Sequence, residues 1–304
     1  MAPPVPDKHR YNHSMAPTST ADLSTRFLFS GADIRGEVVH LSDAYQDLLA
    51  VHDYSPTTAT LLGQFAAAAV LISNNLKYRG RIILQARSES PLSLVMVECS
   101  SEREIRGIAR GDTSADSDNP LALISGGQLA LTIEREGGQR YQGIVALEAP
   151  SLAEALSDYF AQSEQLHTRF ILAAEGESAA GFMLQQLPAQ IAQGAADRQE
   201  QWQAATVLAD TLTVEELLNL DTTVVLHRLY HEYDVKLFDP KTVTYRCRCT
   251  RQRSLDALSL LPLDELEAAL EDEGVITMTC EMCNAVYRFS REELPTLAED
   301  RILH

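Results

Sequence analysis

Two tight cysteine pairs near the C-terminus constrain this chain more than any other feature. The segment YRCRCTRQRS holds Cys247 and Cys249, and TCEMCNAVYRF holds Cys280 and Cys283. The chain has five cysteines in 304 residues, and the fifth, Cys99, lies far from both pairs in the sequence. Four thiolates complete a tetrahedral shell around zinc, with zinc–sulfur distances of about 2.3 Å, and leave no open position for catalysis. The spacing therefore predicts one zinc ion per chain, bound by these four cysteines.

The residues around the cysteines predict a small module that needs such a metal site. Segment 263–273 carries leucines at helical spacing between Pro262 and Gly274, which is typical of a helix. The runs VITMTC and AVYRF predict a β-hairpin, and the pair Ser290 and Glu293 predicts a capping box that begins a last helix. Apolar residues are too few to hold this module together alone. Zinc contributes about 10–16 kcal/mol to the folding of small zinc peptides, so loss of the metal would unfold the module.

The same cysteines have a redox chemistry. Alternate residues on an extended chain lie within about 7 Å, at the edge of disulfide reach. Cys247 with Cys249, and Cys280 with Cys283, can therefore each close a local disulfide once metal is lost. Zinc also holds the sulfurs as thiolates, the form that reacts with oxidants. The residue after Cys283 is Asn284, which tolerates the left-handed conformation that some zinc turns require.

The net charge and the local basic residues point to different partners. The formal charge of −18 argues against nucleic acid as a partner, since nucleic-acid binding needs clustered Lys and Arg. Four arginines nevertheless surround the first cysteine pair: Arg246, Arg248, Arg251 and Arg253. They can offset the thiolate charge, form a solvated basic face, or contact nucleic acid as in a zinc ribbon. The whole-chain charge favours the first two alternatives.

Composition predicts a cytoplasmic protein without a membrane span. Apolar residues make up 45% of the chain, enough for a core, and no window reaches the roughly eighteen uncharged apolar residues that a span needs. The N-terminal run MAPPVPDKHRYNHSMAPTSTADLS lacks the hydrophobic core of a signal peptide and predicts a disordered extension over residues 1–24. Paired cysteines in a reducing cytosol bind metal or respond to redox state more often than they form structural disulfides.

Residues 25–191 predict an α/β substrate-binding domain. FLFSGADIRGEVVHL predicts a strand with a glycine-marked turn or bulge, followed by a helix capped by Ser42. Ser55 and Pro56 begin a long alanine-rich helix that we expect to be buried. Alternating runs from RIILQAR to YQGIVALE predict a mainly antiparallel sheet covered by helices. Ser151 begins a further helix, and TRFILAA and GFMLQQL predict the last strands.

Residues 192–246 predict a helical linker. Acidic residues outnumber basic ones, yet leucines and valines recur at helical spacing. The segment lacks the length and apolar density to fold alone, so we expect it to dock elsewhere as a metastable element, while a permanent helical subdomain fits the pattern equally well. Residues 247–304 then form the zinc-binding redox sensor. The predicted fold class is α+β: a sheet-and-helix domain, a helical linker and a small C-terminal zinc-binding domain.

No pattern of an enzyme emerges, and we expect no catalytic residue. His227 and His231 lie one helical turn apart, but no nearby acid or cysteine completes a metal site, so we interpret them as ordinary linker residues. Cys99 lies in an apolar strand and is expected to be buried. A thiol–disulfide oxidoreductase is the best enzyme alternative, but its Cys-x-x-Cys begins a helix, whereas Cys280 and Cys283 lie in a predicted hairpin.

From about Arg26 to its end, the chain resembles the 33 kDa chaperonin family of redox-regulated heat-shock holdases. The similar segments are the two cysteine pairs, YQGIVALE, DYFAQSEQLHTRF, AAGFMLQQLPAQ and VLHRLYHEYDVKLFDP. The resemblance implies a reduced, zinc-bound, inactive form. It implies that oxidation forms disulfides between neighbouring cysteines, zinc is released, the zinc module and linker unfold, and the exposed surface binds unfolding client proteins. It also implies a homodimer in the activated state.

The chain departs from the family pattern in its N-terminal extension and in Asn284, where the family often has glycine. We expect Asn284 to change the stability of the zinc site. A structural zinc-ribbon protein that binds nucleic acid remains the alternative outside the chaperones.

Overall fold

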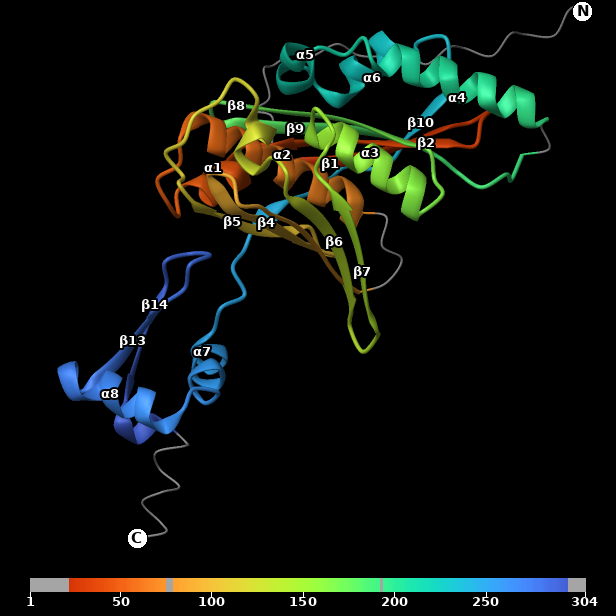
Figure 1. The fold of residues 1–304 in the computed structure, drawn as a ribbon. Helices are drawn as coiled ribbons and strands as arrows, with labels where there is room; N and C mark the ends of the chain where they lie inside the picture. Colours follow the sequence, from red (N-terminus) through yellow and green to blue (C-terminus); the bar gives the residue numbers. More distant parts are fainter. Residues whose placement is uncertain (1–21, 75–78, 192–193, 295–304) are drawn as a thin grey trace, which may run out of the picture.

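The computed structural model describes residues 22–74, 79–191 and 194–294. Within these residues the chain forms two six-stranded sheets, a two-stranded hairpin and eight α-helices (Figure 1). The predicted α+β class is confirmed. Residues 1–21 of the predicted extension lie outside the described residues, and strand β1 already begins at Leu23.

The body, residues 22–191, contains nine strands and three α-helices within its described part. In chain order they are β1 (Leu23–Phe29), β2 (Ile34–Leu41), α1 (Asp43–Leu49), α2 (Pro56–Ser73), β3 (Gly80–Arg87), β4 (Leu92–Ser100), β5 (Glu104–Gly111), the 3₁₀ turn η1 (Pro120–Ile124), β6 (Gln128–Arg135), β7 (Arg140–Ala146), α3 (Leu152–Ser163), β8 (Thr168–Glu175) and β9 (Ser178–Gln186).

The linker and the C-terminal module follow. The linker contains α4 (Ala195–Ala209), α5 (Val214–Asn219), α6 (Thr222–Tyr230), β10 (Val235–Leu237), β11 (Lys241–Thr242) and β12 (Thr244–Tyr245). The C-terminal module, residues 247–294, contains α7 (Arg251–Leu258), α8 (Leu263–Glu273), β13 (Val275–Thr279), β14 (Val286–Ser290) and the 3₁₀ turn η2 (Arg291–Glu293).

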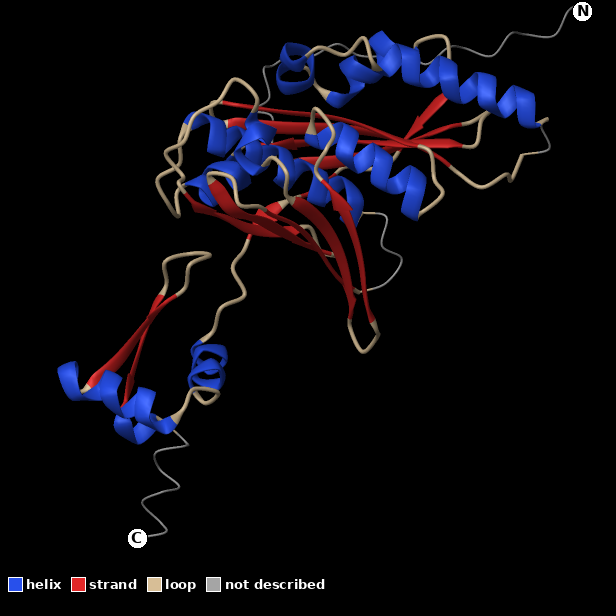
Figure 2. Ribbon diagram, in the orientation of Figure 1, coloured by secondary structure: helices blue, strands red, loops and turns tan. Residues whose placement is uncertain are grey.

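Two sheets enclose the main core. The first sheet has the strand order β10-β1-β2-β9-β8, with β11 also paired to β1, and the second has the order β12-β5-β4-β3-β6-β7. Figure 2 shows them as separate layers with helices between them. Helix α2 runs through this middle layer and contacts strands of both sheets. It is long and apolar enough to cross a membrane, but most of it is buried in the body, as predicted for a core helix.

Local signals explain where the body helices begin. The Ser55 side chain accepts a hydrogen bond from the Thr58 amide, and Pro56 occupies the first turn of α2, as predicted. Ser151 caps α3 in the same way. Ser42 occupies the predicted N-cap position of α1, but its hydroxyl makes no capping bond. The Asp22 carboxylate instead accepts the amide hydrogens of Ser42 and of Ala44 within α1, at 2.7 and 3.1 Å.

The first β pattern is a hairpin, and the predicted glycine-marked turn lies at Gly31, between β1 and β2. β1 and β2 pair in antiparallel register, with Phe27 opposite Gly36. A Cβ at Gly36 would lie 2.0 Å from the Phe27 ring, so glycine is required for the ring to lie against β2. The glycine therefore marks a close approach of a side chain to the backbone and not a bulge.

The linker is helical only in its first part. Helices α4, α5 and α6 cover the outer face of the first sheet, where they form a second hydrophobic cluster (Figure 1). The cluster contains Phe27, Phe29, Val38 and Phe182 from the sheet and Trp202, Leu217, Leu229 and Tyr230 from the helices. The end of the linker instead adds β10 and β11 to the first sheet and β12 to the second, so the prediction of helix throughout 192–246 is wrong. These short strands add to existing sheet edges, which a single-sequence pattern does not reveal.

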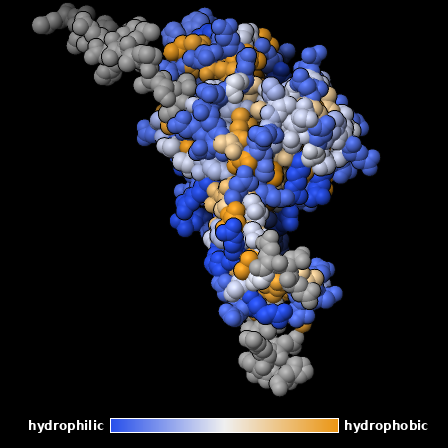
Figure 3. Space-filling model, turned by 90° about the vertical axis from the view of Figure 1, so that its left-hand side faces the viewer, coloured by the Kyte–Doolittle hydropathy of each residue, from blue (hydrophilic) through white to orange (hydrophobic). Residues whose placement is uncertain are grey.

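The C-terminal module is a small unit with its own core. Its buried apolar residues are Leu258, Leu266, Leu270, Ile276, Phe289 and Leu294. The predicted helix over 263–273, its left-handed end at Gly274, the β13–β14 hairpin and the Ser290–Glu293 capping box are all present. Helix α7, which Thr250 caps, was not predicted. In the space-filling view the module projects from the body as a narrower lobe, and a hydrophobic strip crosses a mostly hydrophilic face (Figure 3).

One buried carboxyl group lies between the sheets. Glu37 on β2 is 1% exposed, and its carboxylate contacts the Ser24 hydroxyl and the Asn74 amide at the end of α2. Its second oxygen is buried without a hydrogen-bond partner among the described residues. Burial raises the pKa of Glu37 to about 7, although the two hydrogen bonds and the charges of Arg26 and Arg35 act in the opposite direction.

The raised pKa of Glu37 makes stability depend on pH. The folded state binds the proton more tightly than the unfolded state, so this residue favours folding at low pH and its contribution is lost as pH rises from 4.5 through about 7. The shift corresponds to about 3 kcal/mol. We expect Glu37→Gln to remove this loss. The free energy of unfolding of the variant should therefore rise relative to that of the parent between pH 5 and pH 8.

Denaturant unfolding at pH 5 and at pH 8 measures the change in the free energy of unfolding. Glu89→Gln, at an exposed carboxylate, is the matched control and should keep the parent's pH dependence. An identical pH dependence for Glu37→Gln and the parent would contradict the assignment.

Candidate metal centre

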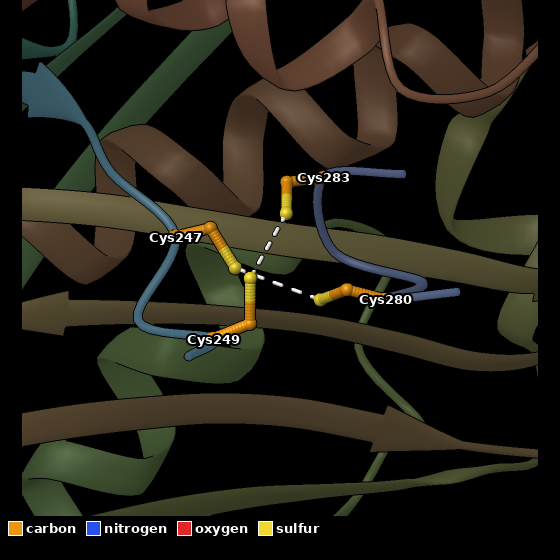
Figure 4. A group of neighbouring side chains, drawn as sticks. All are labelled: Cys247, Cys249, Cys280 and Cys283. Carbon is orange, nitrogen blue, oxygen red and sulfur yellow. Dashed lines mark hydrogen bonds between the residues drawn. The ribbon is translucent and has the colours of Figure 1, made fainter. Parts of the chain in front are cut away.

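The four predicted cysteines come together from two separate segments. Cys247 and Cys249 lie on the extended chain between β12 and α7, and Cys280 and Cys283 lie on the turn between β13 and β14. Their side chains point toward one another (Figure 4). The four sulfur atoms all lie within 4.8 Å of one another. Two sulfur–sulfur contacts cross between the segments, at 3.7 Å for Cys247 with Cys280 and 3.3 Å for Cys249 with Cys283.

Backbone hydrogen bonds shape the turn that carries the second pair. The carbonyl of Cys280 accepts bonds from the amides of Cys283 and Asn284, at 3.2 and 2.7 Å, and its own amide donates to Ala285 at 2.9 Å. Asn284 has a φ of 56°, in the left-handed region that asparagine was expected to tolerate after the last cysteine. The turn directs both sulfurs to one side. Because the Cys-x-x-Cys lies in a hairpin turn and not at the start of a helix, it lacks the local setting of a thiol–disulfide oxidoreductase.

The first pair is held by an extension of the second sheet. β12 pairs in parallel with β5, and the Arg246 amide continues the ladder by donating to the Ile105 carbonyl at 2.9 Å. The Arg246 side chain forms an ion pair with Glu104 at 2.7 Å. Beyond the cysteines, the Thr250 hydroxyl accepts the Arg253 amide and begins α7. The segment is therefore anchored on both sides of Cys247 and Cys249.

The arrangement fits a tetrahedral metal ion with four thiolate ligands. For zinc–sulfur distances of about 2.3 Å, sulfurs at the corners of a tetrahedron lie about 3.8 Å apart. The observed separations are close to this value. Two further groups touch the sulfurs: the Tyr287 hydroxyl is 3.2 Å from Cys249, and an Arg106 nitrogen is 3.9 Å from Cys247. Such hydrogen-bond donors orient metal ligands and offset their charge.

The thiols do not ionise equally. Burial opposes ionisation of Cys247, but the Cys249 amide and the neighbouring thiols donate to its sulfur and lower the pKa of Cys247 to about 7. Burial raises the pKa of Cys280 and of Cys283, and contacts with Cys247 or Cys249 raise both further. These two thiols therefore favour the protonated form at neutral pH, and a cation bound at the centre would be required to hold all four sulfurs as thiolates.

The second cysteine turn docks on the body. The Asn284 side-chain amide donates to the carbonyl of Val51, just after α1. The ring Nε2 of His52 donates to the Glu281 carbonyl at 2.7 Å, and Arg110 on β5 forms an ion pair with the Glu281 side chain. Sequence reasoning missed these body residues, because nothing in their local pattern marks a partner more than 150 positions away.

The other predicted candidates lie apart from the metal centre. Cys99 is fully buried on β4, as expected, and burial raises the pKa of its thiol to about 12 despite a 3.0 Å contact with the Ser73 hydroxyl. The rings of His227 and His231 lie 5.9 Å apart in the linker. Within the described part of the chain, neither histidine belongs to a group able to hold a metal ion, and the four cysteines are the only such group found.

Arg106 is a further residue that the sequence did not single out. It lies on β5 and forms an ion pair with Glu98 on β4 at 2.9 Å, while its other nitrogen reaches Cys247. Alternation along β5 places it on the outer face of the second sheet, away from the buried Ile105 and Gly107 neighbours. Its contact with the metal centre becomes evident only in the structure, where the C-terminal module lies against the outer face of the second sheet.

Comparisons with known proteins agree with the fold and the cysteine pattern. The family model described as Hsp33 protein matches residues 22–290. A 33 kDa chaperonin of Pseudomonas aeruginosa (strain UCBPP-PA14) is 50% identical over 284 residues, which cover 92% of this chain and 95% of the relative. The 33 kDa chaperonin of Azotobacter vinelandii (strain DJ) is 48% identical over the same length and coverage.

A solved structure shows the same fold. The crystal structure of the 33 kDa chaperonin, Heat shock protein 33 homolog, from Thermotoga maritima superposes with a TM-score of 0.81 at 22% identity, covering 93% of this chain and all of that one. The family model spans most of the chain, and the curated relatives share about half of its residues over nearly their whole length. The chain therefore belongs to the 33 kDa chaperonin family, Hsp33.

Proposed function

We propose that this protein is a cytoplasmic, redox-regulated holdase that binds unfolding proteins after its four-cysteine centre is oxidised. One observation carries the proposal: the only candidate metal ligands in the described chain are also the only thiols placed to form disulfides with one another. Oxidation would therefore remove every ligand that holds the C-terminal module together. The protein would act by binding clients and not by catalysing a reaction.

The resident ion of this proposal is zinc. Bound zinc supplies a structural cross-link between the β12–α7 segment and the β13–β14 turn, worth about 10–16 kcal/mol in small zinc peptides. The module's own core has six buried apolar residues, which is too small a cluster to stabilise it alone. Removal of the four thiolates from the shell would thus leave the module unfolded.

Oxidation would pair neighbouring cysteines. Cys247 with Cys249, and Cys280 with Cys283, would each give two electrons to one peroxide, whose O–O bond breaks to form two molecules of water after proton uptake. Each pair forms one disulfide, so two peroxides consume four thiolates. The lowered pKa of Cys247 favours a thiolate at neutral pH, the reactive form.

Loss of the module would weaken the linker next. The linker ends at Arg246, directly before Cys247, and β12 contributes only two residues to the second sheet. The helices α4, α5 and α6 are held mainly by the hydrophobic cluster on the first sheet. Their detachment would expose the sheet residues Phe27, Phe29, Ile34, Phe182 and Leu184 as a binding surface for apolar segments of clients.

The net charge suits this role. A formal charge of −18 causes mutual repulsion between copies and keeps a protein with an exposed apolar face in solution. The same exposed face would also be available to a second copy, in keeping with a homodimer in the activated state.

Peroxide treatment at heat-shock temperature tests the switch. We expect release of one zinc per chain, two disulfides between neighbouring cysteines, dimerisation, and a gain in suppression of client aggregation. A chelating dye, peptide mass spectrometry, sedimentation and light scattering measure these four outcomes. Cys99→Ala should respond like the parent, because the Cys99 thiol is buried and its pKa is raised.

The double variant Cys247→Ser and Cys249→Ser provides the opposite test. It keeps only two thiolates, so we expect it to bind no zinc and to suppress aggregation without peroxide. A double variant that carries zinc and is as inactive as the untreated parent would disprove the sensor role.

Asn284 tests how backbone strain sets the stability of the zinc site. Asn284→Gly and Asn284→Ala both lose the contact with Val51, but alanine in the left-handed region costs about 1–2 kcal/mol more than glycine. We expect the alanine variant to bind zinc about tenfold more weakly than the glycine variant. Equilibrium competition with a zinc chelator measures this ratio. Equal affinities would show that backbone strain at position 284 does not change the zinc affinity.

Two tyrosines allow a matched test of linker release. The Tyr230 hydroxyl donates to the Ala205 carbonyl between linker helices at 2.9 Å, and the Tyr45 hydroxyl donates to the Ala59 carbonyl within the body at 2.8 Å. Each change to phenylalanine should lower the free energy of unfolding of its own region by about 1 kcal/mol. Only Tyr230→Phe should raise the aggregation-suppressing activity of the reduced, zinc-loaded protein. If both variants raise it equally, general instability and not linker release controls the activity.

A further inference from the structure

A pocket of about 400 Å³ lies where the body meets the C-terminal module. Its body side is formed by the ends of β3, β4 and β6, and its other side by Arg248 and Arg253 of the module. Figure 1 shows α7, which carries Arg253, below the second sheet on the side toward which the β6–β7 turn projects. The pocket therefore exists only while the module is docked.

Arginine is concentrated in this pocket. Five arginines line it, three from the body and two from the module: Arg79, Arg81, Arg135, Arg248 and Arg253. They are a fifth of the 25 lysine and arginine residues in a chain whose net charge is −18. The lining also holds three glutamates, Glu102, Glu134 and Glu136, so the pocket keeps a net positive charge.

Most of this positive charge has no carboxylate partner. Arg81 is neutralised, because it pairs with Glu134 at 2.6 Å and with Glu98 at 3.3 Å. Among the residues that the structure describes, no carboxylate lies within ion-pair distance of Arg79, Arg248 or Arg253. Arg248 is partly buried, and Arg253 donates to the Arg248 carbonyl at 3.1 Å, which fixes the two module arginines relative to each other.

Two serines add neutral donors. The Ser100 hydroxyl oxygen accepts the amides of Glu102 and Glu104, and the Ser101 hydroxyl oxygen accepts the amide of Gly80. Both oxygens are thus held in place by N–H donors, which leaves each O–H available to an acceptor in the pocket. A site with several guanidinium groups and hydroxyl donors suits a multivalent oxyanion, because arginine bonds phosphate oxygens in a bidentate manner.

We propose that this pocket binds a small oligophosphate, the size of pyrophosphate or triphosphate, that bridges the body and the C-terminal module. A volume near the lower limit of small-molecule pockets, roughly 300–1,000 Å³, suits a few phosphate groups. A nucleic-acid strand suits it less well, because the chain as a whole carries a formal net charge of −18.

Bridging gives the anion a regulatory effect, and this part rests on the proposed redox switch. An anion that binds only the docked state favours docking, by about 100-fold at a concentration of 100 times its Kd. Oligophosphate would therefore slow detachment of the module and delay activation by peroxide. Binding itself does not depend on chaperone activity, so the two proposals can fail separately.

Calorimetric titration of the reduced, zinc-loaded full chain tests the site. Tripolyphosphate is the probe, ATP tests whether a nucleoside-bound triphosphate is accepted, and orthophosphate tests the need for several phosphate groups. The variants Arg79→Gln and Arg253→Gln remove one exposed guanidinium from each side of the pocket. Arg87→Gln is the matched control, because Arg87 is exposed at the opposite end of β3 from the pocket. Zinc content checks that each variant keeps a folded module and that the probe does not strip the metal.

We expect one tripolyphosphate per chain, weakened at least about tenfold by either pocket variant and unchanged by Arg87→Gln. Matching affinity for ATP would identify the triphosphate group as the ligand, and exclusion of ATP would assign the site to free oligophosphate. Absence of binding, or equal weakening by Arg87→Gln, would overturn the proposal. Weaker binding in Arg79→Gln alone would place the anion on the body and overturn the proposed bridge. Tighter binding of a short RNA than of tripolyphosphate would show that the pocket is a nucleic-acid site and not an oligophosphate site.

Discussion

The convergence of four sulfurs is the constraint on which the C-terminal module of this molecule depends. Cys247 and Cys249 follow an extension of the second sheet, and Cys280 and Cys283 lie on the turn of a hairpin, so the sulfur cluster joins two segments more than 30 residues apart in the chain. The small core around Phe289 lies at the far side of the hairpin from the cysteine turn. A metal ion bound by these four sulfurs would supply the stabilisation that a larger hydrophobic core supplies in the body.

The two faces of the first sheet pack against different parts of the chain. Its inner face packs on α2 in the main core, while its outer face packs on the linker helices around Phe29 and Tyr230. The two faces are independent clusters, because alternate residues along each strand point to opposite sides. Detachment of the linker would thus leave the main core intact. A chain built in this way can gain an apolar binding surface without unfolding its body.

The second sheet has a different outer face. Its exposed side carries charged residues such as Arg81, Glu98 and Arg106, which pair with one another across neighbouring strands. This polar face meets the C-terminal module through single side chains, including the Arg106 contact with Cys247 and the Arg110 ion pair with Glu281. Polar contacts of this kind orient a docked part without a large apolar interface, so the module can separate from the body without exposing a core. The arginine-lined pocket lies within the same polar boundary.

The sequence alone determined the chemistry and most local elements. Cysteine spacing selected the four candidate metal ligands that the fold brings together, because two tight pairs of thiols are typical of a four-cysteine metal site. Proline, serine and glycine signals located the ends of α2, α3 and α8, since capping is decided within a few residues. The left-handed residue after Cys283 also followed from local chemistry.

Only the tertiary structure decided which distant parts meet. The Asp22 carboxylate replaced Ser42 as the cap of α1, and the end of the linker became strands because the sheet edges at β1 and β5 were available to it. The docking contacts of Val51 and His52, and the meeting of Arg79 with Arg253 around one pocket, join residues far apart in the chain. Local sequence patterns reflect propensity and burial within a few residues, whereas such pairings arise from the packing of whole layers. For this reason the sequence determined the four candidate ligands, and the tertiary structure determined which body residues surround them.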